Sequence, residues 1–170
     1  MRLYAGKIPT IADELVTSLA KEGDIEVENA DEVRLDLEAV LKEYLRRERN
    51  MLEEAKNRME ARGLSYGALG KVKAQIAKEQ GAPTTEDVLP FLIEQILQIL
   101  FHSNNVVEIY ADDFKLREKI TPILRKHMEV DAELDEEVRS KIKNLEEGTA
   151  SFDVEYAKVM EQIKRKRGLS

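Results

Sequence analysis

Residues 88–101 read VLPFLIEQILQILF, and this apolar stretch decides the fold. Its apolar residues surround most of a helix circumference, interrupted by one glutamate and two glutamines. Thr84 and Thr85 precede it and can cap its first turn. The stretch is shorter than the ~20 residues that a membrane span needs. We therefore expect a central buried helix that ends near residue 103, with other helices packed around it.

A much longer amphipathic pattern lies upstream, over residues 31–62. Apolar residues recur there at three- and four-residue steps, and Gly63 follows, which is typical of a helix end. At the rise of an α-helix this segment spans roughly 48 Å, which is long for a domain of this size. Residues 45–56 are rich in charge. We expect that part to project, or to pack on a partner through a narrow apolar stripe.

Two shorter helices are expected beside the long one. Thr10 stands in the N-cap position of a helix that Gly23 ends. Another helix covers residues 71–80 and is stopped by Gly81. Residues 65–70 contain two glycines, which is typical of a linker. Strand signals are weak throughout the chain, so the pattern predicts helices and loops.

The two halves of the chain resemble each other. When residues 11–64 are aligned with residues 116–169, nine of the 54 pairs are identical and the apolar positions agree in phase. We interpret this as an internal duplication of a short helix, an acidic loop and a long helix. The related units are then residues 1–64 and 106–170, and residues 65–105 form the central linker and buried helix.

The predicted fold class is all-α. It consists of two related short-helix/long-helix units around a central apolar helix, with the long helices as extended arms. Gly148 and Thr149 interrupt the pattern of the second long helix, so we expect the second arm to be bent.

Composition excludes several classes of protein. The 27 basic and 34 acidic residues give a net charge of −7, which offers no bulk attraction to nucleic acid or anionic lipid. There are no cysteines, so disulfides, thiolate metal sites and cysteine nucleophiles are excluded. No secretion signal or membrane span is visible. We expect a soluble, cytoplasmic protein.

The stretch with the most candidate metal-binding or catalytic side chains is residues 100–114, LFHSNNVVEIYADDF. His102, Asp112 and Asp113 have the ligand types of a divalent-metal site. Their spacing matches no ligand motif, and only one histidine takes part. The favoured interpretation is that one helix ends here and another begins, with the aspartates capping the second helix. We expect no metal and no cofactor.

Basic residues are concentrated near the ends of the two long helices. If the arms lie side by side, these ends can form one patch that binds an anion or nucleic acid. The simpler interpretation is that they compensate the helix dipole. No aromatic residue is interleaved with them, which weakens the case for single-strand binding. The candidate residues are Lys164, Arg165, Lys166 and Arg167 in the second unit, with Arg58 and Arg62 in the first.

Four segments together carry a family resemblance: RLYAGKIPTIADELV near the start, LFHSNNVVEIYADD in the middle, ITPILRKHM, and EQIKRKRGL at the end. With these segments the chain resembles the bacterial family known as domain of unknown function 507 over nearly its whole length. The resemblance implies a cytoplasmic bacterial protein with a single shared architecture. It carries over no catalytic residue, because the family defines none.

Three functions remain open. The first is a non-enzymatic interaction or scaffold protein whose arms bind a protein partner or a second copy. The second is a nucleic-acid-associated protein that uses the basic helix ends. The third is a metal-dependent function at His102, Asp112 and Asp113. No catalytic order of Ser, His and Asp and no clustered carboxylate pair indicates hydrolysis, so we expect no enzyme.

Overall fold

The computed structural model describes residues 1–170, with the side chain of Thr85 excepted. It confirms the all-α class: seven α-helices accompany one two-stranded ribbon in the described residues. Three short 3-10 turns, Ala5–Lys7, Tyr66–Ala68 and Thr85–Asp87, precede helices. The elements are α1 (Ile8–Lys21), β1 (Ile25–Val27), α2 (Ala30–Arg62), α3 (Leu69–Gln80), α4 (Val88–His102), β2 (Val106–Ile109), α5 (Asp113–Met128), α6 (Asp131–Lys141) and α7 (Ala150–Lys166).

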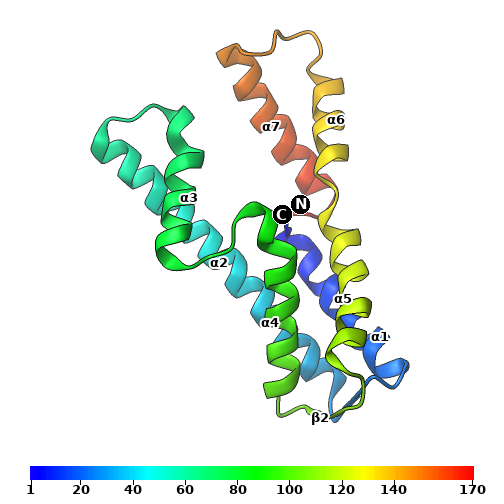
Figure 1. Cartoon of the computed structure of the whole chain (residues 1–170). Helices are drawn as coiled ribbons and strands as arrows, with labels where there is room; N and C mark the ends of the chain where they lie inside the picture. The colour runs from blue at the N-terminus through cyan, green and yellow to red at the C-terminus, as the bar shows by residue number, and fades with distance from the viewer.

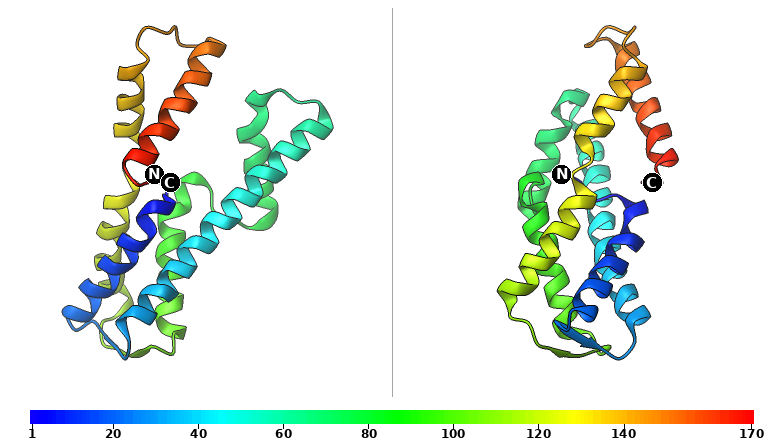
Figure 2. Two further views of the ribbon diagram at one scale, coloured as in Figure 1. Left: turned by 180° about the vertical axis from the view of Figure 1, so that it is seen from behind. Right: turned by 90° about the vertical axis from the view of Figure 1, so that its right-hand side faces the viewer.

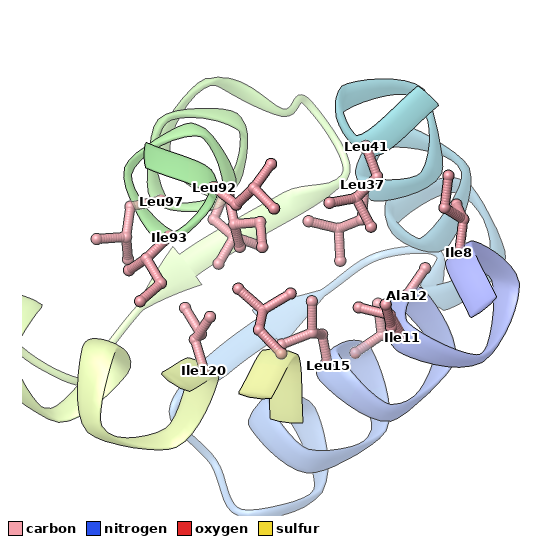
Figure 3. Packing of buried hydrophobic residues seen from close by; sticks show 14 of the residues in the cluster. Ile8, Ile11, Ala12, Leu15, Leu37, Leu41, Leu92, Ile93, Leu97 and Ile120 are labelled. Atoms are coloured by element: carbon pink, nitrogen blue, oxygen red, sulfur yellow. The ribbon is translucent and has the colours of Figure 1, made fainter. Parts of the chain in front are cut away.

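A four-helix body carries two diverging helical arms (Figures 1 and 2). The body consists of α1, the first half of α2, α4 and α5, and it holds the largest apolar core (Figure 3). Leu15, Leu37, Leu92 and Ile120 come from these four helices and are completely buried. Because each such side chain contributes ~1.5–3 kcal/mol on burial, this core is the main source of stability.

Helix α4 was expected to be central and buried on all sides. It is instead amphipathic, with one exposed face, and is one of four helices that form the core. Seven of its residues are buried, but Glu94, Gln98 and Phe101 form an exposed face, and Phe101 is 58% exposed. Pro90 lies in its first turn, where its missing N–H costs little. None of the described helices combines the length and apolarity required to cross a membrane.

A short antiparallel ribbon closes the base of the body, which the sequence did not predict. Ile25 pairs with Ile109 and Val27 with Val106, with a register irregularity between them. The carbonyl of Asp24 also accepts hydrogen bonds from the backbone N–H groups of Tyr110 and Ala111. The ribbon therefore joins two segments that are about 80 residues apart in the chain.

The long helix α2 agrees closely with the prediction. Asn29 caps it by accepting from the N–H groups of Asp31 and Glu32, and Gly63 ends it with φ +63°. Helix α1 begins earlier than predicted. Its first residue is Ile8, with Pro9 in the first turn, so Thr10 lies inside the helix.

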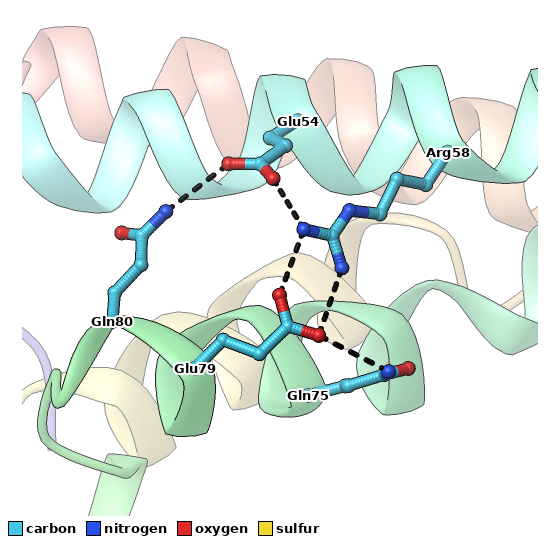
Figure 4. A network of polar contacts seen from close by, with 5 residues as sticks. All are labelled: Glu54, Arg58, Gln75, Glu79 and Gln80. Carbon is cyan, nitrogen blue, oxygen red and sulfur yellow. Dashed lines mark hydrogen bonds and ion pairs between the residues drawn. The ribbon is translucent and has the colours of Figure 1, made fainter.

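Arm 1 is the second half of α2 together with α3, which folds back on it. The narrow apolar stripe expected in residues 45–56 is confirmed, and its partner is α3. Polar contacts flank this apolar contact: Arg58 bonds to Glu54 at 2.6 Å and to Glu79 at 2.8 Å (Figure 4). The core of arm 1 is Met51, Ala55, Met59, Val72, Ile76 and Ala77.

Arm 2 is the hairpin of α6 and α7. The expected second long helix is wrong, because residues 142–149 leave the helical conformation and the chain reverses there. Gly148 takes φ +87° in this turn, so the interruption is a full reversal, where a bend was expected. The core of arm 2 is Tyr4, Leu134, Val138, Ile142, Phe152, Ile163 and Leu169.

The order of elements differs between the two halves. In the first half a strand separates α1 from α2, whereas in the second half β2 precedes α5 and no strand follows it. In shape, α5 followed by α6 is the counterpart of α2, and α7 is the counterpart of α3 (Figure 1). The predicted duplication at an offset of 105 residues therefore finds no support in the arrangement.

The segment that follows the N-terminus lies against the last residues of the chain, near the point where the arms diverge. The N–H of Gly6 donates to the carbonyl of Leu169 at 3.0 Å, and Leu3, Tyr4 and Leu169 are buried there. A Cβ atom on residue 6 would lie 1.8 Å from the carbonyl oxygen of Gly168, so only glycine fits at residue 6. This contact, called the clasp below, fixes the base of arm 2 to the body.

Candidate functional site

A cleft of about 750 Å³ lies where the two arms diverge from the body. Both arms and both chain ends contribute to it, which makes it a product of the tertiary fold. Its volume is within the range of ligand-binding clefts. The wall on arm 1 includes Tyr44, Leu45, Leu52 and Lys73, and the opposite wall includes Arg2, Tyr4, Glu161 and Lys164.

Two cations lie close to one tyrosine ring in this cleft. The guanidinium carbon of Arg2 and the ammonium nitrogen of Lys164 each lie 5.8 Å from the centre of the Tyr4 ring. Among the side chains that the structure describes, neither cation forms an ion pair with a carboxylate. Burial lowers the pKa of Lys164, and the nearby charge of Arg2 lowers it further. This site would therefore be stabilised by an anion.

The carboxylates in the cleft are mostly engaged elsewhere. Asp131 accepts a hydrogen bond from the Tyr4 hydroxyl and lies 3.1 Å from the α-amino group of Met1. Glu48 accepts from Lys73 at 2.8 Å. Glu161 is the remaining carboxylate of the lining and lies on the exposed side of α7. Arg2 and Lys164 thus face the cleft without an ion-pair partner, although the charges of Glu161 and Asp131 partly offset the lowering of the Lys164 pKa.

The tyrosine itself is not a catalytic base. Burial raises the pKa of Tyr4, and its hydrogen bond to the negatively charged Asp131 raises it further. The hydroxyl thus stays protonated, and its bond to Asp131 fixes the ring beside the two cations. The arrangement can hold an anion, and the apolar side chains of Leu45, Leu52 and Val88 can take an aliphatic group beside it.

The predicted basic residues do not form one patch. Arg58 and Arg62 lie toward the far end of arm 1, while residues 164–167 lie at the base of arm 2, beside the clasp (Figure 1). Arg58 is held by Glu54 and Glu79, and Arg167 by Glu133 and Glu137. Lys164 lines the cleft, and Arg165 and Lys166 are exposed on α7.

The residues proposed as weak metal ligands serve as helix ends. Asp112 caps α5 by accepting from the N–H of Lys115 at 2.8 Å, and Asp113 pairs with Arg117 at 2.6 Å. A ring nitrogen of His102 lies 2.7 Å from the carbonyl of Gln98, one turn earlier in α4. The predicted capping role is confirmed for Asp112, whereas Asp113 lies in the first turn and its side chain pairs with Arg117. Within the described residues, no group of three or more His, Asp or Glu side chains has the arrangement of a metal site.

Sequence reasoning missed Arg2 as a site residue. Tyr4 was not named as a site residue either, and Lys164 was expected only as part of a basic helix end. The signal for Arg2 is weak because a single basic residue beside a tyrosine is common. The clasp, together with the contacts of residues 1–4 with Met128 and Asp131, brings residues 2–4 against residue 164.

The comparisons agree with the resemblance noted in the sequence. A family model described as "Protein of unknown function (DUF507)" matches residues 1–169. A search of curated proteins finds no match. The match covers almost the whole chain, including the segments that form the body, both arms and the cleft. The chain therefore belongs to the DUF507 family.

Proposed function

We propose that this is a non-enzymatic binding protein that holds an acidic segment of a protein partner in the cleft between its arms. The observation that supports this most is the pair of cations, Arg2 and Lys164, that lie beside the buried ring of Tyr4 without an ion-pair partner. Carboxylates that reach this pair form charge-assisted hydrogen bonds, which are stronger than neutral ones.

The rest of the lining supports a peptide partner. Leu45, Leu52 and Val88 provide apolar contacts beside the cations, and Arg49 adds a third positive charge on arm 1. A segment that carries both acidic and aliphatic side chains complements such a wall. The chain as a whole carries a charge of −7, whereas this cleft carries cations. An acidic partner is therefore attracted to the cleft and repelled by most of the remaining surface.

Binding of nucleic acid has less support. A duplex needs several cations along one face, but the predicted basic ends lie apart and two of the six residues are held in ion pairs. A metal-dependent function has less support as well, because Asp112 and Asp113 are used at the start of α5.

Photo-cross-linking tests the proposal. A benzoylphenylalanine at Leu52 lies in the cleft, whereas one at Glu53 is adjacent in α2 but does not line it. With the protein expressed in its native host and lysates treated with nuclease, we expect a cross-linked protein band from position 52 and none from position 53. Mass spectrometry should place the cross-link within an acidic segment of the partner.

Charge reversal provides the second part of the test. R2E together with K164E should abolish the band from position 52. The matched control is R165E together with K166E, which changes two exposed charges on the same helix, and it should leave the band unchanged. Equal cross-linking from positions 52 and 53, or a band that nuclease removes, would contradict the proposal.

A further inference from the structure

Helix α5 leaves one face of the body open, on a surface that the cleft does not include. Phe114 is 75% exposed at the start of this face, and Pro122 is exposed at its middle. The other residues that line a shallow hollow along the helix are Arg117, Glu118, Thr121, Arg125, Lys126 and Glu129. No residue that the structure describes lines both this hollow and the cleft.

Pro122 leaves a backbone acceptor on this face. In a regular helix the N–H of residue 122 donates to the carbonyl of residue 118, but proline has no N–H. The Glu118 carbonyl therefore lacks its intrahelical donor, although α5 continues for six residues beyond the proline. A hydrogen-bond donor from outside the subunit can satisfy it.

The charges on this face are self-complementary. Glu118 and Arg125 stand at equal distances on either side of the midpoint between Thr121 and Pro122. If two α5 helices pack antiparallel about a two-fold axis through that midpoint, each Glu118 meets Arg125 of the partner subunit. The two-fold axis generates two equivalent Glu118–Arg125 ion pairs, one on each side of the axis and each about 5 Å from it along the helix.

We propose that two copies of this chain associate through the exposed face of α5, with a two-fold axis between Thr121 and Pro122. The guanidinium of Arg125 has donors enough for both the carboxylate and the free carbonyl of the partner's Glu118. Phe114 of each subunit covers the last turn of the opposite helix. Exposed aromatic and arginine side chains of this kind are enriched in protein interfaces.

The other charges on the face do not oppose this arrangement. The two-fold axis places Arg117 opposite Lys126 of the partner subunit, two positive charges. Each is already neutralised within its own subunit: Arg117 by Glu94 and Asp113 at 2.6 Å, and Lys126 by Glu14 at 3.2 Å. Arg125 lies 3.4 Å from Glu129, a contact it can exchange for Glu118 of the partner subunit.

Sedimentation velocity on the full chain tests the dimer. Because the contact is one helix face, we expect the mass to rise from monomer to dimer between about 1 µM and 1 mM. E118R and R125E each place like charges across the axis and should weaken the dimer at least tenfold. The double variant E118R/R125E restores the opposite charges and should recover dimerisation. R165E, on α7, is the control and should leave the dissociation constant unchanged.

Two outcomes would overturn the proposal: a wild-type chain that stays monomeric over the whole range, or a double variant that associates no better than either single variant. Thermal unfolding of each variant verifies that the subunit is still folded where dimerisation is lost. The cleft variant R2E/K164E should dimerise normally, so this test succeeds or fails independently of the proposed binding function.

Discussion

At the scale of single residues, the clasp depends on Gly6, which has a hydrogen atom where other residues have a Cβ atom. Replacing Gly6 with alanine puts a methyl group 1.8 Å from the carbonyl oxygen of Gly168, so one of the two chain ends must move. We expect G6A to lower the free energy of unfolding by about 3 kcal/mol, the upper range for overpacking. Urea denaturation measures this.

Gly70 provides the control for this change. An added Cβ meets no atom within 4 Å there, and the residue lies in the first turn of α3. G70A should be neutral or stabilise the protein by about 0.5 kcal/mol, because alanine loses less backbone entropy than glycine in a helix. If G6A and G70A behave alike, the close approach of the chain ends is not as described.

A buried carboxylate joins α1 to α5. Asp24 is only 2% exposed, and its carboxylate bonds to Lys119 and lies 3.5 Å from Lys115. Replacing Lys119 with methionine leaves this buried charge with one exposed, more distant partner. We expect K119M to destabilise the protein by about 3 kcal/mol, measured by urea denaturation.

The double variant D24N/K119M should recover much of that loss, because it removes the buried charge together with its partner. K126M removes an exposed lysine from a surface pair with Glu14, and it should cost less than about 1 kcal/mol. A similar loss for K119M and K126M would mean that Asp24 is not buried.

Glu14 predicts a contribution to stability that depends on pH. Burial raises the pKa of this carboxyl, but hydrogen bonds from Lys126 and His127 lower it more, so the net pKa is below 4.5. Because the pKa of Glu14 is lower in the folded protein than in the unfolded chain, its ionised carboxylate stabilises the fold at pH values above 4.5. This contribution to stability is lost as the pH falls from 4.5 through the pKa of the folded protein. At pH 7 we expect E14Q to be less stable by up to about 1 kcal/mol.

The measurement is the difference in unfolding free energy between wild type and E14Q as a function of pH. It should shrink below pH 4.5. The control is E60Q, which removes an exposed charge near the end of α2 and should change the unfolding free energy at pH 7 by less than E14Q does. A difference that stays constant down to pH 3 would contradict the assignment.

At the scale of elements, the sequence predicted what is local and periodic. Helix α2 was predicted nearly to its bounds because its cap, its stripe and Gly63 all lie within the segment. The strands were missed because Ile25–Val27 and Val106–Ile109 are too short to show alternation, and their pairing depends on a distant segment. The second long helix was mispredicted because the helical patterns on both sides of residues 142–149 were joined into one helix, and the interruption at Gly148 and Thr149 was interpreted as a bend although the chain reverses there.

Arm 1 predicts a unit that opens separately from the body. Its core has six residues, and Ile76 at its centre is completely buried. Replacing Ile76 with alanine should cost about 2–4 kcal/mol. Because most contacts of α3 are with α2, the loss should show as faster amide hydrogen exchange in α3 and in the second half of α2.

The exposed Lys78 on the same helix is the control, and K78A should leave exchange unchanged. Exchange in α1 and α4 should stay slow in I76A. If all four helices exchange faster together, arm 1 and the body form one cooperative unit.

At the scale of the whole molecule, the cleft could not be predicted. Lys164 was a candidate, but Arg2 and Tyr4 approach it only because residues 2–6 lie across the base of arm 2. The predicted patch of basic helix ends failed for the same reason. Its premise was two parallel arms, whereas arm 2 is a hairpin whose basic end returns to the body.

The two arms should differ in stiffness. Arm 1 continues from the body through the unbroken helix α2, whereas Glu129 and Val130 leave the helical conformation between α5 and α6. We expect arm 2 to move relative to the body more than arm 1. Spin labels at cysteines introduced at Lys21 and Ala61 should give a narrow distance distribution, and labels at Lys21 and Lys141 a broader one.

The chain has no native cysteine, so both label pairs can be introduced without other changes. All three positions are exposed, at the base and on the two arms. Equal widths for the two pairs would mean that the clasp holds arm 2 as firmly as α2 holds arm 1.

The ribbon at the base also has a consequence for synthesis on the ribosome. Strand β1 emerges early, but its partner β2 and the helix α5 that covers α1 follow about 80 residues later. Until then the apolar face of α1, including Leu15 and Leu19, has no complete cover. At typical elongation rates of roughly 5–20 residues per second, the nascent chain therefore exposes the apolar surface of an incomplete core for several seconds. We expect chaperones to bind this surface during synthesis.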